Sequence, residues 1–222
     1  MPEKVILSWS GGKDSTLALY KIKRDPAYRV VSLLTTINEQ YDRISLHGVR
    51  RELLELQAEA LGFPLDKVWV SNNGTNDEYE AKMRQALAEH LNAGVSGVVF
   101  GDIFLEDLKK YREEKLLSVG LKGIFPLWQK NSFDLACTFI YLGFKAVVTC
   151  VDTQVLDAAF GGREYDEQFL VDLSEGVDPC GENGEFHSFV YDGPIFHRPV
   201  GFHTGEQVLK HDRFFFCDLI PD

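Results

Sequence analysis

Six consecutive residues near the start of the chain have the types that bind phosphate groups. The segment Ser-Gly-Gly-Lys-Asp-Ser occupies positions 10–15, at the end of the first apolar run. Adjacent glycines let the backbone approach an anion closely, and backbone amides and hydroxyls donate hydrogen bonds to it. The lysine adds a positive charge, and the aspartate is placed to bind magnesium or to cap the next helix. These types predict a pyrophosphate site formed by Ser10, Gly11, Gly12, Lys13, Asp14 and Ser15.

The spacing of this segment differs from two common nucleotide-binding loops. The Walker A motif needs a glycine at position 7 and Ser or Thr at position 14, where this chain has Leu7 and Asp14. The dinucleotide motif GxGxxG does not occur either. A short loop of this kind suits pyrophosphate better than a dinucleotide. The simpler alternative is a tight turn in which Asp14 or Ser15 only caps a helix.

The elements around the loop alternate between strand and helix. Apolar runs typical of buried strands occur at 5–7, 30–34, 68–70, 98–100 and 146–151, with a shorter run at 125–127. Helical spacing of apolar residues occurs at 17–22, 49–60, 76–93, 105–118 and 133–142. This alternation predicts an α/β fold with a doubly wound parallel sheet, in which ligands bind at the carboxyl ends of the strands.

The pattern changes after about residue 152. Short alternating runs at 186–191 and 213–219 and a turn at 192–193 predict a small antiparallel β element packed against the sheet. We therefore expect two domains. Residues 1–127 form the nucleotide-binding α/β domain, and residues 128–222 form a smaller C-terminal α+β domain that binds the substrate.

Composition limits the partners of the protein. Asp and Glu number 34 against 23 Lys and Arg, and the formal net charge of −11 argues against binding of extended nucleic acid. The four cysteines are too widely spaced to indicate a zinc site or a disulfide framework. We expect no signal peptide and no membrane span, because no stretch approaches the roughly 20 apolar residues required. These features predict a cytoplasmic protein.

Several motifs resemble one family. The SGGKDS loop is similar to the PP-loop signature of the N-type ATP pyrophosphatases. Three further segments, GDIFLEDLKKYREE at 101–114, GLKGIFPLW at 120–128 and DPCGENGEFHSFVYDGPIF at 178–196, resemble the motifs of the diphthine–ammonia ligase family. Together the motifs span nearly the whole chain. One departure is Ser188, at a position where the family often has threonine.

The resemblance implies an adenine nucleotide α-hydrolase-like fold and an ATP-dependent amide ligase. The enzyme would use ATP and Mg²⁺ to adenylate diphthine of translation elongation factor 2, and ammonia from ammonium would then displace AMP. Lys13 and Asp14 would serve catalysis, with Asp14 as the metal ligand. Analogy also places near the nucleotide Thr35, Thr36, His47, Gly101, Asp102 and Arg112.

Each of these residues also has a purely structural interpretation. Asp102 follows the fourth predicted strand and is equally suited to capping the next helix. Arg112 binds either a phosphate or substrate group, or a neighbouring glutamate on the surface. His47 either contacts the nucleotide or orders its own loop.

The C-terminal motif adds Glu182, Asn183 and Glu185 as candidate catalytic residues. A solvated turn is the alternative, since the segment lies between glycines. In a functional role, the two glutamates would bind ammonium, deprotonate it or hold the trimethylammonium group of the substrate. Asn183 would orient either ligand. Cys180 is expected to be a packed thiol.

Two other functions stay open from the sequence. One is a PP-loop ATP pyrophosphatase that acts on another acceptor, a small carboxylate or a tRNA. The negative charge and the absence of paired cysteines argue against tRNA. The other is a non-catalytic nucleotide-binding protein. The sequence does not decide the oligomeric state, a homo-oligomer included.

Overall fold

The structure is a computed structural model that describes residues 1–44, 47–71 and 75–222. Its first sheet is mainly parallel and contains β1 (Glu3–Ser8), β2 (Tyr28–Asn38), β4 (Leu65–Val70), β5 (Val95–Val99) and β6 (Lys122–Ile124). The parallel strands lie in the order β4-β2-β1-β5-β6. The short β3 (Arg43–Ile44) pairs antiparallel with the end of β2.

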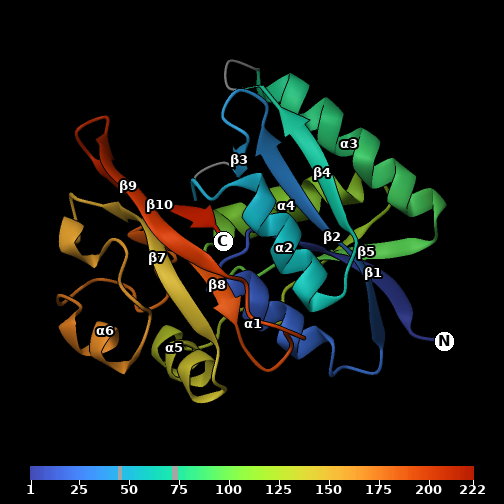
Figure 1. The fold of residues 1–222 in the computed structure, drawn as a ribbon. Helices are drawn as coiled ribbons and strands as arrows, with labels where there is room; N and C mark the ends of the chain where they lie inside the picture. The colour runs from blue at the N-terminus through green and yellow to red at the C-terminus, as the bar shows by residue number, and fades with distance from the viewer. Residues whose placement is uncertain (45–46, 72–74) are drawn as a thin grey trace.

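Helices cover both faces of this sheet (Figure 1). The covering helices are α1 (Lys13–Ile22), α2 (Arg51–Leu61), α3 (Asn76–Asn92) and α4 (Glu106–Leu117). Successive side chains of a strand point to opposite faces. In β1, Val5 and Leu7 pack in one cluster with residues of α1 and α2, whereas Ile6 packs in a second cluster with residues of α3 and α4. The predicted doubly wound α/β fold is confirmed.

The strand order fixes where a ligand can bind. The chain moves outward from β1 to β2 and β4, and then returns through α3 to β5 on the other side of β1. In such a sheet, a crevice opens at the carboxyl ends of the two strands where the order reverses. Here these strands are β1 and β5, and the segment at 10–15 leaves the end of β1.

The C-terminal part forms a second, antiparallel sheet in the order β8-β7-β10-β9, as expected for a small β element. Its strands are β7 (Lys145–Asp152), β8 (Phe186–Asp192), β9 (Phe202–Lys210) and β10 (Phe214–Pro221). The helices of this region are α5 (Ser132–Tyr141), the short 3₁₀ helix η1 (Ala158–Phe160) and α6 (Glu167–Asp172). No helix in the described ranges is long and apolar enough to cross a membrane.

Two predicted strands are corrected by the structure. The run at 146–151 does not extend the parallel sheet, because β7 pairs antiparallel with β8 and β10. The run at 125–127 is not a strand, and β6 ends at Ile124. Pro126 has no N–H with which to continue a ladder. Strand β6 has no apolar run from which it could be predicted, because its first two residues are Lys122 and Gly123.

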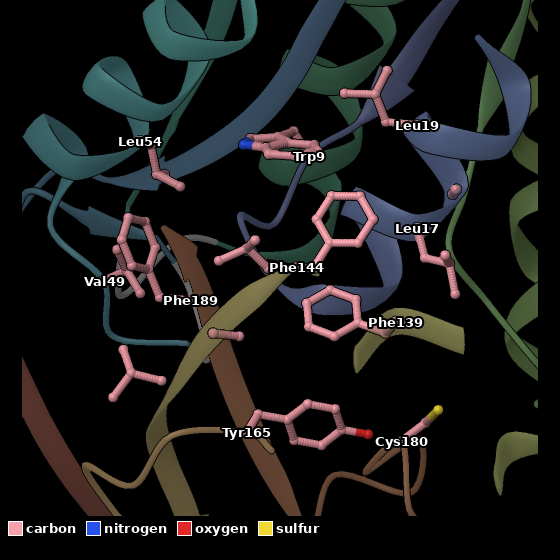
Figure 2. Packing of buried hydrophobic residues seen from close by; sticks show 14 of the residues in the cluster. Trp9, Leu17, Leu19, Val49, Leu54, Phe139, Phe144, Tyr165, Cys180 and Phe189 are labelled. Carbon is pink, nitrogen blue, oxygen red and sulfur yellow. The ribbon is translucent and has the colours of Figure 1, made fainter. Parts of the chain in front are cut away.

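One hydrophobic cluster joins the two sheets. Phe139 of α5 stacks on Phe144 at a centroid distance of 5.0 Å, and Phe144 meets the edge of Tyr20 of α1. Figure 2 shows Phe139 and Phe144 beside Leu17 of α1. Helices α1 and α2 thus pack between the sheets. The division of the chain at 127/128 into two domains remains a proposal.

Candidate functional site

The phosphate loop, residues 10–15, is a tight turn between β1 and α1. Gly11 has φ of +77°, and a Cβ there would lie 2.6 Å from Leu54 Cδ2, so only glycine fits. The Gly12 N–H donates to Ser10 Oγ over 3.2 Å, and Ser10 Oγ lies 3.1 Å from Ser15 Oγ. Gly12 is the N-cap of α1, so neither Asp14 nor Ser15 is the cap residue. The loop therefore presents hydroxyls and amides at a helix N-terminus, where an anion is stabilised.

Strand β8 of the second sheet completes this loop. The Lys13 N–H donates to Ser188 Oγ over 3.2 Å, and the Val190 N–H donates to the Gly11 carbonyl over 2.9 Å. A Cβ on Gly12 would lie 3.1 Å from the Ser188 carbonyl oxygen. The loop thus depends on residues more than 170 positions away in the chain.

Lys13 is the buried cation of the loop, with 4% of its surface exposed. Its Nζ lies 2.8 Å from Asp14 Oδ2 and donates to the carbonyl of Cys180. Burial opposes its charge, but Asp14 and the other acidic groups nearby outweigh it and raise the pKa of Lys13. Burial raises the pKa of Asp14, despite the adjacent ammonium group. The ammonium group links the phosphate loop to the C-terminal motif.

The segment after β5 packs against the start of α1. A Cβ on Gly101 would lie 2.8 Å from the backbone carbon of Asp14, so this glycine allows close backbone contact. Asp102 is 8% exposed, and its Oδ2 lies 2.7 Å from Arg112 Nε. Asp102 is not a cap, since Leu105 is the N-cap of α4. Arg112 pairs with Asp102 rather than with a neighbouring glutamate, and it lies over the ring of Phe100.

The acidic loop, residues 178–185, faces Lys13 from the other side. Glu182 Oε1 accepts hydrogen bonds from the backbone N–H groups of Ile103, over 2.8 Å, and Phe104, over 3.4 Å. Burial raises the pKa of Glu182 to about 7, with Asp14 and Asp102 adding to the effect. The acidic loop is therefore bonded to the segment after β5, and it is not a free solvated turn.

Glu185 is 6% exposed at the base of the acidic loop. Its Oε1 accepts from Asn183 Nδ2 over 2.9 Å and from the Asp178 N–H over 3.1 Å. Its Oε2 is buried and has no hydrogen-bond partner among the residues that the structure describes. A buried carboxylate oxygen without a partner is costly and is well suited to a cationic or protonated ligand.

A cavity of about 650 Å³ opens at the carboxyl ends of the parallel strands. Ser10, Thr35, Thr36, His47 and Arg112 are among the residues that line it. Within residues 1–44, 47–71 and 75–222, the buried atoms Thr35 Oγ1 and His47 Nδ1 have no hydrogen-bond partner, so both are available to a ligand. The remaining predicted residues do not line this cavity, namely Gly11, Gly12, Lys13, Asp14, Ser15, Gly101, Asp102, Glu182, Asn183 and Glu185. The site thus has two parts that meet at the phosphate loop.

His47 stacks on His187 of β8 at a centroid distance of 4.3 Å. Burial, together with His187 and Lys13, lowers the pKa of His47 well below its ordinary value. Burial lowers the pKa of His187 to about 4. Both rings are therefore neutral at physiological pH and act as hydrogen-bonding groups rather than cations.

Sequence reasoning missed several residues of the site. Ser188 and His187 lie in the motif at 178–196, but their residue types alone predict no role in the site. Tyr165 donates to the Pro179 carbonyl over 2.7 Å and holds the acidic loop, and Gln57 contacts the phosphate loop from α2. Cys180 is a packed thiol as expected, since burial raises its pKa and its Sγ points to the Ser132 carbonyl.

The carboxylates near Lys13 are compatible with a magnesium site of the kind that ATP completes. Among residues 1–44, 47–71 and 75–222, no group of three or more His, Cys, Asp or Glu is arranged to hold a metal. Magnesium in nucleotide sites needs only one or two carboxylates, with phosphates and water as the other ligands. Burial raises the pKa of Asp14 because it disfavours the charged carboxylate, and a bound cation would oppose this effect.

Comparison with known proteins agrees with this arrangement. Residues 3–123 match the family model described as the diphthamide synthase N-terminal domain, and residues 131–218 match the diphthamide synthase C-terminal domain. The chain is 27% identical to the diphthine–ammonia ligase of Danio rerio over 93% of this chain and 89% of that protein. It is 27% identical to the protein of that name from Homo sapiens, over 90% and 83% of the two chains. For Schizosaccharomyces pombe the identity is 25%, over 97% of this chain but 38% of that protein.

Proposed function

The chain belongs to the diphthamide synthase family, and from that membership we propose that it is an ATP-dependent ligase that converts diphthine to its amide with ammonia. The relatives named diphthine–ammonia ligase match nearly the whole chain. The observation that carries the proposal is the phosphate loop, which lies next to a nucleotide-sized cavity and is bonded through Lys13 to the acidic loop. These are the parts that adenylation and amide formation require.

The proposed reaction has two steps. A carboxylate oxygen of the acceptor attacks the α-phosphorus of ATP, the bond to the bridging oxygen of pyrophosphate breaks, and an acyl-adenylate forms. Ammonia then attacks the acyl carbon, and AMP leaves with the electrons of the acyl–oxygen bond. One proton is released from the attacking nitrogen. The acceptor we propose is diphthine in translation elongation factor 2.

The phosphate loop would stabilise the leaving pyrophosphate. Its amides and hydroxyls are already in place before the reaction, so little reorganisation is needed as charge develops. Lys13 is held charged by its acidic neighbours and would balance the negative charge on the bridging oxygen. Mg²⁺, held by Asp14 and the phosphates, would neutralise the remaining charge when bound.

The cavity would hold the adenosine part of ATP. Thr35 and His47 line it, and their Oγ1 and Nδ1 atoms, which have no partner in the described part of the chain, would bond to the nucleoside. Arg112 also lines the cavity and pairs with Asp102, and its guanidinium would contact a phosphate of ATP.

The acidic loop would receive the nitrogen nucleophile. Ammonium must lose a proton before it can attack, and a buried carboxylate next to the reacting carbon is a suitable acceptor. The unpartnered Oε2 of Glu185 is the atom we assign to this contact, with Asn183 holding the other oxygen. Glu182 keeps the loop bonded to the segment after β5.

The proposal extends to the setting of the reaction. We place it in the cytoplasm, because the four cysteines are unpaired and translation supplies the acceptor there. The site draws its residues from one chain, so the chemistry holds for a monomer or for a homo-oligomer. We propose no binding of extended nucleic acid, given the net charge of −11.

Isotope exchange tests the adenylation step by itself. The purified chain is incubated with Mg²⁺, ATP, labelled pyrophosphate and diphthine-bearing elongation factor, with ammonium omitted. Reversible adenylation moves the label into ATP, and the exchange depends on the acceptor. Label that enters ATP from labelled phosphate with ADP, and not from pyrophosphate, would contradict the proposal because it indicates an acyl-phosphate.

A further inference from the structure

Gln57 of α2 is a fully buried amide next to the phosphate loop, with 0% of its surface exposed. Its Nε2 donates to the carbonyl of Gly11 over 2.9 Å and to the carbonyl of Val190 over 2.6 Å. Its Oε1 accepts from Trp9 Nε1 over 2.8 Å. The amide thus connects α2, the phosphate loop and β8.

These partners define a single orientation of the amide. Trp9 Nε1 can only donate, and the two carbonyls can only accept. Rotating the Gln57 amide by half a turn would place oxygen against both carbonyls and N–H against N–H. All three hydrogen bonds of the amide would then be lost, and a buried polar group without a hydrogen bond is costly.

The carbonyl of Gly11 determines where the next N–H points. A trans peptide is planar, so the Gly11 carbonyl and the Gly12 N–H point in opposite directions. Gln57 and the Val190 N–H hold this carbonyl toward the protein interior. The Gly12 N–H is thereby directed to the side of Ser10 Oγ, which lines the cavity.

The backbone of Gly11 has the freedom that this geometry needs. At φ of +77°, glycine reaches a conformation that is unfavourable for other residues, so the orientation of the next peptide depends on its hydrogen bonds. A flip of the Gly11–Gly12 peptide would turn the Gly12 N–H away from Ser10 Oγ and present the Gly11 carbonyl on that side instead. An anion would be repelled by that arrangement.

We propose that Gln57 is the positioning residue of the phosphate loop: its amide locks the Gly11–Gly12 peptide so that the Gly12 N–H faces the pyrophosphate of ATP. This role rests on the proposed function. Gln57 contacts the loop and not the reacting atoms, so its effect reaches the substrate through Gly12. It also makes the binding of pyrophosphate depend on the docking of β8.

Calorimetry with three ligands tests this role in the intact chain. Gln57→Glu keeps the size and the acceptor for Trp9 but loses both donors, and Gln57→Met removes the polar contacts without adding charge. We expect ATP and pyrophosphate to bind at least about tenfold more weakly to both variants, a loss equal to one hydrogen bond. Adenosine, which lacks the pyrophosphate, is expected to bind within about twofold of the unaltered chain.

Leu53→Val is the matched control on the same helix, because Leu53 is also fully buried but lies one turn away from the loop contact. Loss of packing alone lowers the folded fraction for every ligand, so it cannot change the ratio of pyrophosphate to adenosine affinity. The inference is supported only if the ratio of pyrophosphate to adenosine affinity changes in the Gln57 variants and stays the same in Leu53→Val. If Gln57→Glu does not fold, Gln57→Met decides.

Two negative results are distinguishable. If the unaltered chain binds ATP and pyrophosphate and the Gln57 variants bind both equally well, the inference is wrong and the proposed function stands. If the unaltered chain binds neither ligand, the proposed function fails, and this inference fails with it.

Discussion

The two loops that meet at Lys13 are built in opposite ways. The phosphate loop presents donors, namely backbone amides, hydroxyls and an ammonium group. Neutral side chains hydrogen-bond to its backbone, such as Gln57 from α2 and Ser188 from β8. The acidic loop presents acceptors: Glu182 accepts from the backbone N–H of Ile103 after β5, and Glu185 accepts from the backbone N–H of Asp178 in the same loop. One loop suits an anion and the other suits a cation.

This difference matches the two halves of an amide-forming reaction driven by ATP. The first half must stabilise a leaving pyrophosphate, and the second must receive an ammonium ion and remove a proton. The Lys13 ammonium bonds to Asp14 and to the Cys180 carbonyl, so it ties the two loops together. Changes in one loop should therefore affect a different step from changes in the other.

The largest effect is expected from Lys13→Met. The loss of the loop cation removes charge stabilisation in the transition state and leaves the Cys180 carbonyl without its donor. We expect turnover, followed as AMP formation, to fall by about 1,000-fold. Lys21→Met, on the same helix but outside the site, is the control and should retain activity. Normal turnover in the Lys13 variant would break the proposed division of roles.

A smaller loss is expected from Asp14→Asn. The amide keeps the size of the side chain but binds Mg²⁺ and Lys13 less well, so turnover should fall by about 300-fold. Thermal stability should fall less than turnover, because burial opposes the Asp14 charge and Lys13 keeps its bond to the Cys180 carbonyl. Asp25→Asn, in an exposed turn after α1, serves as the control. An Asp14 variant with normal activity and normal Mg²⁺ dependence would remove this residue from the metal site.

Glu185→Gln should separate the roles of the two loops, because it changes amide formation and leaves ATP binding intact. We expect ATP to bind with unchanged affinity in calorimetry, because Glu185 lies outside the nucleotide cavity. Amide formation should slow by about 100-fold, since an amide cannot take a proton from ammonium. Glu175→Gln, at an exposed position between α6 and the acidic loop, is the control. Weaker ATP binding in the Glu185 variant would instead place this residue in the nucleotide site.

The smallest effect concerns stability and pH. Burial raises the pKa of Glu182 from 4.5 to about 7, so the folded chain binds this proton more tightly than the unfolded chain. Stability linked to Glu182 is therefore present below about pH 4.5 and is lost as the pH rises to about 7. Because Gln does not titrate, the free energy of unfolding of Glu182→Gln should fall over this pH range by about 1–2 kcal/mol less than that of the unaltered chain. This value is reduced because the Glu182 side chain is partly exposed. Urea unfolding at several pH values measures the difference, and parallel profiles would contradict it.

The sequence predicts the parallel sheet better than the second sheet. Helix α3 begins at Asn76 as predicted, where a capping box between Thr75 and Glu78 marks its start. Strand β9 gives no such signal, because its side chains are exposed or half-buried at every position. The apolar run of β7 resembles a buried parallel strand, and its antiparallel partners follow only from long-range pairing.

The candidate site also contains residues that a local sequence pattern predicts and residues that only long-range packing brings together. The phosphate loop is a local sequence pattern, and the structure places it at the crevice where the strand order reverses. Gln57 has no local pattern, since its carbonyl partners are 46 and 133 residues away. Likewise, the pairing of Asp102 with Arg112 depends on how α4 packs after β5. The roles of the predicted site residues remain predictions.

The most direct test of the account is a product analysis. The chain is incubated with Mg²⁺, ATP, ammonium carrying heavy nitrogen and diphthine-bearing elongation factor, with AMP followed by chromatography and the acceptor by mass spectrometry. We predict AMP only when the acceptor is present, in equal amount to an acceptor amide that contains the heavy nitrogen. An unchanged acceptor, or AMP formed without it, would contradict the claim that the two loops serve one amide-forming reaction.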